Sequence, residues 1–219
     1  PTEPGAAQPT WTLTDLQPQS CGYEKTYGLD AFEGQPLLVI LLWGGCGFCQ
    51  SQAVKLQQMH YELRAEGVGI HFVIVNMARG ESSFPEKFIE RTYFPLFQDV
   101  EDVDAWGAMD GGKDDFYFYR SDGVLHNFMS FKNEDELTLN DPDPTQTAAG
   151  YTNLKNALLD LVANDQKPSA ADEESSMAAG MQQSEAAIAG GELSDTAGNS
   201  EAPTMNGGQE GAGGMADAP

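Results

Sequence analysis

The chain has 219 residues, and its 34 acidic and 11 basic side chains give a formal net charge of −23 at pH 7. Such a charge argues against nucleic acid and anionic membranes as partners, because both are bound through basic faces. The apolar runs fall well short of the roughly 20 residues of a membrane helix, so we expect no membrane insertion. We also expect a monomer.

The hydrophobic residues, 40 % of the chain, are concentrated in its first three quarters. Residues 169–219 contain no Phe, Tyr, Trp, Val, Lys or Arg. Such a segment cannot bury enough apolar surface to offset an ordering entropy of roughly 1–2 kcal/mol per residue. We therefore predict a folded domain over 9–165 and a disordered acidic tail over 166–219. Residues 1–8 are expected to be a flexible leader that follows a removed export signal, which predicts an extracellular or periplasmic protein.

The first half of the domain predicts parallel strands joined by a helix. A possible edge strand over 11–15 and a turn-rich stretch over 17–35 precede a continuous apolar run over 37–43, as expected of a central strand buried on both faces. After Cys49 the apolar residues recur at steps of three and four, which predicts a helix that Gly67 closes. Residues 70–75 predict a second buried strand.

The second half predicts two helices, a hairpin and a last helix. The helices are expected over 83–93, with Phe84 and Phe88 inward, and over 100–109, separated by a short segment over 95–98. Strands over 116–119 and 124–129 flank the turn Ser121-Asp-Gly, and an acidic insertion over 133–149 leads to a helix over 151–163. The order β–α–β–α–β–β–α predicts an α/β, thioredoxin-like fold with a central mixed sheet flanked by helices.

The motif Cys46-Gly-Phe-Cys49 lies where the central strand passes into the first helix. Unpaired N–H groups and the positive end of the helix dipole favour the thiolate at Cys46, which makes it the expected nucleophile. Cys49, one turn further on, is the expected resolving thiol because the two sulfurs can meet with little backbone movement. The motif predicts a thiol–disulfide oxidoreductase or a peroxide reductase, with a thiol, disulfide or peroxide substrate and a reductant that the sequence does not identify.

Other interpretations of the motif stay open. A zinc site needs four ligands, and the chain adds only Cys21, His60, His71 and His126, so we expect no metal and no cofactor. A structural disulfide inside a non-catalytic secreted binding or scaffold module is the alternative function. Cys21 is expected to be inert, the histidines structural, and Trp43 a wall beside the site.

Several segments, in the same order over residues 9–163, resemble the N-terminal domain of the selenoprotein P family. They are Pro9-Thr-Trp11, the run from Leu37 to Leu42, the Cys46/Cys49 pair, Phe72-Val-Ile-Val-Asn76, and Gly112-Lys-Asp-Asp-Phe-Tyr-Phe-Tyr119 with Asp122-Gly123. Most thioredoxins carry a cis-proline before the corresponding strand. In this chain Asp114 or Asp115 fills that place.

The resemblance implies a redox domain that acts outside the cell. It places Cys46 at the family's selenocysteine position and Cys49 at the partner cysteine. A thiol in place of a selenol favours thiol–disulfide exchange over peroxide reduction. The family's His-rich stretch and its selenocysteine- and cysteine-rich tail do not occur in this sequence, so we do not expect selenium transport to carry over.

Overall fold

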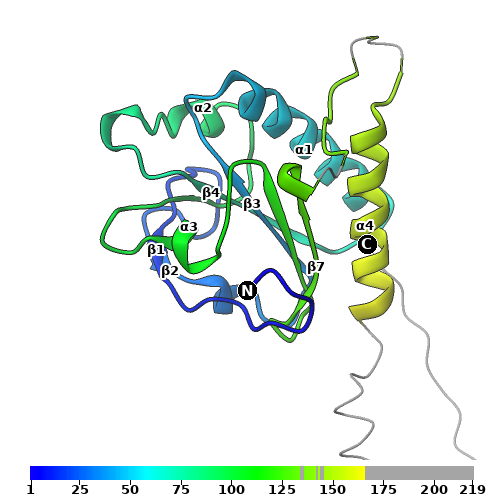
Figure 1. Cartoon of the computed structure of the whole chain (residues 1–219), viewed down its shortest axis with the longest axis horizontal. Helices are drawn as coiled ribbons and strands as arrows, with labels where there is room; N and C mark the ends of the chain where they lie inside the picture. The colour runs from blue at the N-terminus through cyan, green and yellow to red at the C-terminus, as the bar shows by residue number, and fades with distance from the viewer. Residues whose placement is uncertain (134–135, 142, 144–145, 166–219) are drawn as a thin grey trace, which may run out of the picture. The chain divides into compact units, whose positions relative to one another are not determined.

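A five-stranded mixed sheet with the order β5-β4-β3-β6-β7 forms the centre of the folded domain (Figure 1). The computed structural model describes residues 1–133, 136–141, 143 and 146–165, so the tail predicted over 166–219 lies outside the described residues. The central strand β3 pairs in parallel with β4 and antiparallel with β6. The strands are β3 (Leu37–Leu42), β4 (His71–Asn76), β5 (Leu96–Gln98), β6 (Asp115–Tyr119) and β7 (Leu125–Ser130).

Helices α1 (Gly47–Ala65) and α4 (Ala149–Asp165) pack on one face of this sheet, together with Phe88 of the short α2 (Glu86–Ile89). The other face is covered by α3 (Ala105–Ala108) and by the N-terminal segment, in which β1 (Leu13–Thr14) pairs with β2 (Thr26–Tyr27). This is the predicted architecture, an α/β fold with a mixed sheet between two layers.

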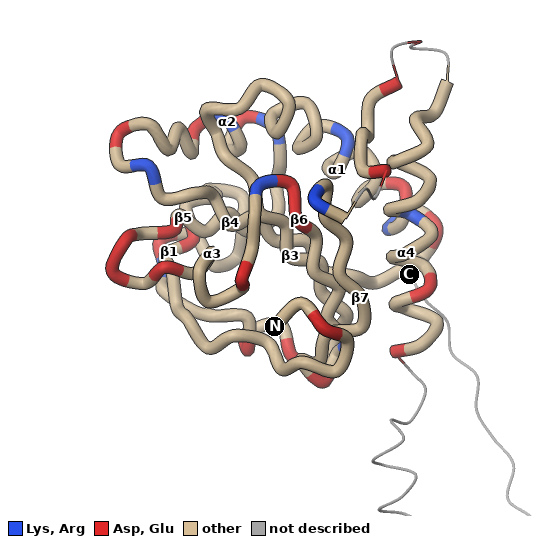
Figure 2. The backbone as a smooth tube through the Cα atoms, in the orientation of Figure 1, with Lys and Arg blue, Asp and Glu red and all other residues tan. Residues whose placement is uncertain are grey.

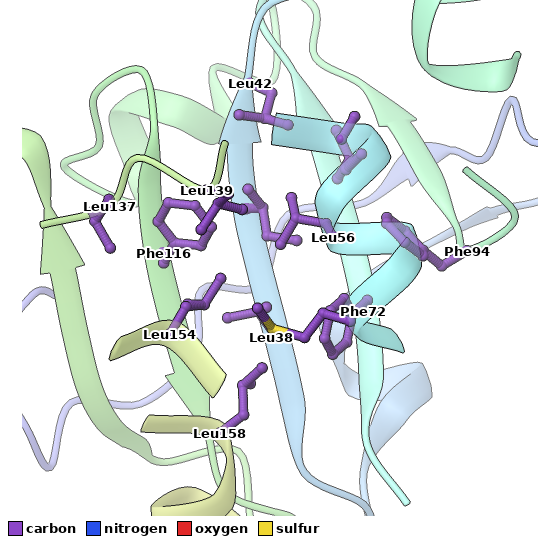
Figure 3. Packing of buried hydrophobic residues seen from close by; sticks show 14 of the residues in the cluster. Leu38, Leu42, Leu56, Phe72, Phe94, Phe116, Leu137, Leu139, Leu154 and Leu158 are labelled. Atoms are coloured by element: carbon purple, nitrogen blue, oxygen red, sulfur yellow. The ribbon is translucent and has the colours of Figure 1, made fainter. Parts of the chain in front are cut away.

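The apolar run of β3 is continuous because both faces of this strand are covered. Leu38, Ile40 and Leu42 pack in the cluster with α1 and α4, and the alternate residues 37, 39 and 41 pack in the cluster on the other face. Figure 3 shows Leu38 and Phe116 of neighbouring strands together with Leu56 of α1 and Leu154 of α4. The sheet thus lies between two cores, and the buried β3 fixes the position of the segment that follows it, which contains Cys46.

The acidic insertion over 133–149 is partly a core element. Leu137 and Leu139 are buried beside Phe116 (Figure 3). The buried Gln52 side chain of α1 donates to the Leu137 carbonyl at 2.8 Å and accepts from the Leu139 N–H at 2.9 Å. This part of the insertion is therefore fastened to the helix that carries the cysteine motif.

Two predicted helices are wrong in length. In place of 83–93 the helix α2 spans four residues, and Phe84, expected inward, is 40 % exposed with φ +49°. Phe84 precedes Pro85, and the proline ring disfavours the helical conformation of the residue before it. The helix predicted over 100–109 is shortened to α3 because Asp104 adopts the left-handed conformation, with φ +48°, and so interrupts the helix. Its side chain accepts from the Gly107 N–H, and the Asp99 carboxylate accepts from the N–H groups of Ala105 and Trp106.

The leader predicted over 1–8 is bonded to the domain for half of its length. The Gly5 N–H donates to the Leu125 carbonyl at 2.8 Å, and the Gln8 N–H donates to the Gly123 carbonyl at 2.9 Å. These bonds line the leader along the β6–β7 hairpin, so residues 5–8 are a part of the fold rather than a free segment.

Candidate functional site

The two cysteines of the motif meet in the first turn of α1. Cys46 is the N-cap residue of this helix, with an extended backbone conformation, and its Sγ accepts from the Cys49 N–H at 3.4 Å. The first N–H groups of a helix have no partner within the helix, so a side chain at the helix start can accept from them. A thiolate is a better hydrogen-bond acceptor than a thiol. Cys46 is partly exposed, Cys49 is fully buried, and both are free thiols in this structure.

Burial makes the two thiols differ in how readily they ionise. Burial is the largest cause that raises the pKa of the Cys49 thiol, followed by its hydrogen bond with Cys46, with a smaller contribution from the Asp114 charge. Cys49 is therefore protonated at neutral pH. Of the two cysteines Cys46 is thus the more exposed, and the unequal roles of the pair stay a prediction.

The loop between β3 and Cys46 is held by amide side chains. The Gly44 N–H donates to Oδ1 of Asn76 at 2.9 Å, and the Gly44 carbonyl accepts from the Gln50 side chain at 2.8 Å. Nδ2 of Asn76 donates to the Ser83 carbonyl at 2.9 Å. A Cβ atom on Gly44 would lie 2.2 Å from the Phe84 carbonyl oxygen, so this close approach requires glycine.

An ion pair between Lys113 and Asp114 lies in the loop that leads into β6, where basic and acidic positions follow one another in Figure 2. Asp114 is buried with φ +66°, and its N–H donates to the Leu41 carbonyl at 2.8 Å. Oδ1 of Asp114 is buried and has no hydrogen-bond partner among the described residues. Burial opposes the charge of Lys113, but Asp114, and to a smaller extent Cys49 and Cys46, raise its pKa.

Of the two aspartates, Asp114 is the one whose charge raises the pKa of Cys49 and whose carboxylate keeps one oxygen without a partner among the described residues. The Asp115 carboxylate is occupied elsewhere, since it accepts from the Gly112 N–H at 2.6 Å and from the Ser130 hydroxyl at 2.5 Å. The peptide bonds of the described residues are all trans. Sequence reasoning had left the choice between the two aspartates open and had missed Lys113, Asn76 and the part of Gln50 altogether.

Exposed aromatic side chains flank Cys46. The rings of Phe48 and Phe131, each 38 % exposed, meet edge to face at 5.5 Å between centroids, and the Lys113 ammonium lies 5.7 Å from the Phe48 centroid. Trp43, three residues before Cys46, donates from Nε1 to the Ser82 carbonyl at 2.8 Å, and the Arg79 guanidinium lies 5.7 Å from its ring centroid. Aromatic rings thus precede and follow Cys46 in the chain, each with a cation near its face.

The remaining candidates lie away from this site. His60 packs against Phe72 with ring centroids 5.1 Å apart, and His126 contacts Asp160 at 2.8 Å from Nε2 to Oδ2. Cys21 is exposed and His71 lies at the start of β4. Among the residues that the structure describes, no group of three or more His, Cys, Asp or Glu is placed to hold a metal ion.

The described helices include none that is both long and apolar enough to cross a membrane.

Comparison with solved structures assigns the class of the fold. A conserved protein from Geobacillus kaustophilus superimposes with a TM-score of 0.56 at 18 % identity and covers 77 % of this chain and 86 % of its own. A thiol:disulfide interchange protein from Bacteroides sp. superimposes with a TM-score of 0.52 at 17 % identity and covers 75 % of this chain and 93 % of its own. At these identities the likeness concerns the fold, which is thioredoxin-like.

The family follows from the sequence. The family described as selenoprotein P, N terminal region, matches residues 5–132, and the chain belongs to it. Human selenoprotein P is 28 % identical over 122 residues, which cover 53 % of this chain and 29 % of the human protein. Mouse selenoprotein P is 28 % identical over 98 residues, which cover 42 % of this chain and 26 % of the mouse protein. The match therefore spans less than a third of these relatives.

Proposed function

We propose that this protein is an exported thiol–disulfide oxidoreductase in which Cys46 is the nucleophile and Cys49 the resolving thiol. The observation that carries the proposal is the asymmetry of the pair. Cys46 is partly exposed and caps α1, since its sulfur accepts from the Cys49 N–H, whereas the Cys49 thiol is buried and protonated. A purely structural disulfide does not require this difference in exposure and protonation between its two cysteines.

The reaction follows from that asymmetry. The Cys46 thiolate attacks one sulfur of a substrate disulfide, so that a mixed disulfide forms and one substrate thiolate leaves. The Cys49 thiol then loses its proton and attacks Sγ of Cys46, which closes the Cys46–Cys49 disulfide and expels the second substrate thiolate. Two electrons pass from the protein to the substrate, and an external dithiol returns them; the same steps in reverse oxidise a dithiol substrate.

Asp114 is the proposed acceptor of the Cys49 proton. Its charge raises the pKa of Cys49, and its Oδ1 is buried with no hydrogen-bond partner in the part of the chain that the structure describes, so a proton can bind there when the thiol ionises. Lys113 holds the other carboxylate oxygen and contributes positive charge next to both sulfurs. The ion pair thus supports the negative charge that passes from one sulfur to the other.

Peroxide reduction by the same pair is the second candidate, favoured by membership of the selenoprotein P family, whose selenocysteine position corresponds to Cys46 in the resemblance described above. The amides nearest to the motif in sequence do not support it. Gln50 donates to the Gly44 carbonyl, and Gln52 is bound to the insertion, so both side chains are engaged within the fold. Thiol–disulfide exchange is therefore the preferred function.

The test compares the reduction of insulin disulfides and the consumption of hydrogen peroxide, both with dithiothreitol as donor. Cys46→Ser is expected to lose at least about 100-fold in rate, because the nucleophile itself is removed. Cys49→Ser is expected to accumulate a mixed disulfide at Cys46, visible by mass spectrometry. Cys21→Ser is the matched control and keeps the wild-type rate. Full activity of Cys46→Ser on both substrates would falsify the proposal, and a rate on peroxide well above that on insulin would exchange the two candidates.

A further inference from the structure

A cavity lies at the opposite end of α1 from the cysteines. It has a volume of about 750 Å³ and is lined by the last turns of α1, the start of β4, the segment around Phe94 and the turns that flank β2. His60 and Arg64 of its lining follow Cys46 by 14 and 18 residues. At a rise of 1.5 Å per residue this is roughly 20–27 Å along the helix. The cavity is thus separate from the redox site.

The charge of this cavity is opposite to that of the chain. Its described lining contains Lys25, Arg64, His60 and His71 but no Asp or Glu, although acidic side chains outnumber basic ones threefold in the sequence. Neither Lys25 nor Arg64 forms an ion pair with any described carboxylate. The cavity therefore carries two cations without carboxylate partners, although the chain has an excess of acidic residues. Such a pair of cations can bind an external anion.

The Asp15 carboxylate contacts Tyr27 of this lining, and both of its oxygens accept hydrogen bonds from neutral donors. Asp15 is buried and accepts from the Tyr27 hydroxyl at 2.7 Å, from the Gln17 N–H at 2.9 Å and from the Leu96 N–H at 3.1 Å. It therefore orients Tyr27 rather than pairing with a cation of the cavity.

The walls of the cavity are aromatic. The His60 ring lies 5.1 Å from Phe72 and 5.8 Å from Phe94 between centroids, and Phe32 lies 5.3 Å from His71. Nδ1 of His60 is buried and has no hydrogen-bond partner in the described part of the chain. This nitrogen is not open to the cavity, so the aromatic side chains and the two cations are what the lining offers to a ligand. Flat rings suit a ligand with a planar apolar body.

We propose that this cavity is a binding site for a small aromatic carboxylate. The guanidinium of Arg64 matches the planar, two-oxygen geometry of a carboxylate, Lys25 adds a point charge, and the rings of Phe72, Phe94 and Phe32 hold the aromatic body. The site is independent of the cysteine chemistry and requires neither Cys46 nor Cys49.

The test uses the full chain and a matched pair of probes, 2-naphthoate and the neutral 2-naphthamide, with binding followed by ¹⁵N-resolved NMR titration. The expected result is saturable binding of naphthoate, at least about 10-fold tighter than that of naphthamide, with shifts at residues 60–72 and 93–95. The double variant Lys25→Gln/Arg64→Gln should lose this preference. Lys55→Gln, which removes one charge from the same helix outside the cavity, should retain the preference for naphthoate. The single variants Lys25→Gln and Arg64→Gln should each retain a part of it.

A second readout does not depend on the charge variants. Cys21 lines the cavity and is exposed, so in a Cys46→Ser/Cys49→Ser background it is the one thiol left to react. Naphthoate is expected to slow its alkylation by iodoacetamide in proportion to occupancy, and naphthamide is not. Equal binding of the two probes, naphthoate shifts centred on Phe48 and Phe131, or no saturable binding at millimolar naphthoate would each overturn the proposal.

Discussion

Among single residues, Cys46 and Cys49 differ by burial, and Asp114 differs from Asp115 by its partners. The Cys49 thiol is enclosed and its pKa is raised, whereas Cys46 reaches solvent at the helix start. Asp115 is saturated with donors, whereas one oxygen of Asp114 is left without a partner among the described residues. These two differences give each of the three residues, Cys46, Cys49 and Asp114, one distinct part in the proposed exchange.

Replacement of the proposed proton acceptor should slow one step only. In Asp114→Asn we expect the closure of the Cys46–Cys49 disulfide to slow by roughly 10²-fold, the lower range for general base catalysis. The first attack, measured by stopped flow in a Cys49→Ser background, should change much less, because Cys46 does not need that base. Removal of the Asp114 charge also lowers the pKa of Cys49, so the lost rate should return in part as the pH rises through the lowered value.

Asp102→Asn is the matched control for this variant, since it removes the same charge from an exposed loop. Equal slowing of both steps in Asp114→Asn would indicate a structural defect and would contradict the role as proton acceptor.

Among the elements, α1 and α4 lie together on one face of the sheet and are joined by two kinds of contact. Leu158 of α4 is fully buried in the cluster that includes α1. Lys155 of the same helix pairs with Glu66 of the region after α1 at 2.7 Å and with Glu62 at 3.3 Å. Apolar burial is the larger of the two contributions, because exposed ion pairs gain little in water.

Leu158→Ala should therefore lower the free energy of unfolding by about 2–5 kcal/mol, whereas Lys155→Met should lower it by less than about 1 kcal/mol. Urea denaturation followed by tryptophan fluorescence measures both. Leu159→Ala is the matched control, because the neighbouring Leu159 is 38 % exposed, and its effect should stay within about 0.5 kcal/mol. A larger loss for Lys155→Met than for Leu158→Ala would contradict this ranking.

For the whole molecule, the dominant quantity is the net charge of −23, and acidic positions are spread over several helices and loops in Figure 2. Like charges at this density repel one another in the compact state. The cavity at the end of α1 is the exception, where cations gather without acidic neighbours in its lining. The protein thus combines a strongly negative chain with a cavity that we propose to bind an anion.

Salt should stabilise this protein, because it screens the repulsion; the screening length falls from about 30 Å at 0.01 M to about 10 Å at 0.1 M and 3 Å at 1 M. We expect the Tm in 0.5 M NaCl to exceed the Tm in 0.01 M NaCl by about 2–4 °C, which corresponds to roughly 1 kcal/mol for a domain of this size. Differential scanning calorimetry at pH 7 measures the shift, and potassium chloride at equal ionic strength is the control. A Tm that falls with added salt would show that attractive surface pairs outweigh the repulsion.

The fold class and the place of the cysteine motif between a strand and a helix were predictable from the residues alone. Period and length predicted β3, α1, β4, the β6–β7 hairpin and α4, because these elements bury whole faces and their apolar patterns are long. The apolar pattern overestimated the two short helices, where a residue before Pro85 and a left-handed Asp104 interrupt the backbone. It also missed β5, a three-residue edge strand whose pairing with β4 is not local.

The surroundings of the two sulfurs and the cavity at the far end of α1 depend on contacts between elements that are distant in the sequence. The contact of Gly44 with Asn76 spans 32 residues, and the arrival of Asp114 beside Leu41 depends on the pairing of β6 with β3. The cation-lined cavity draws residues from β2, α1 and β4. Local periodicity records which residues are buried along one element, but it does not record which elements meet, and a site is made where they meet.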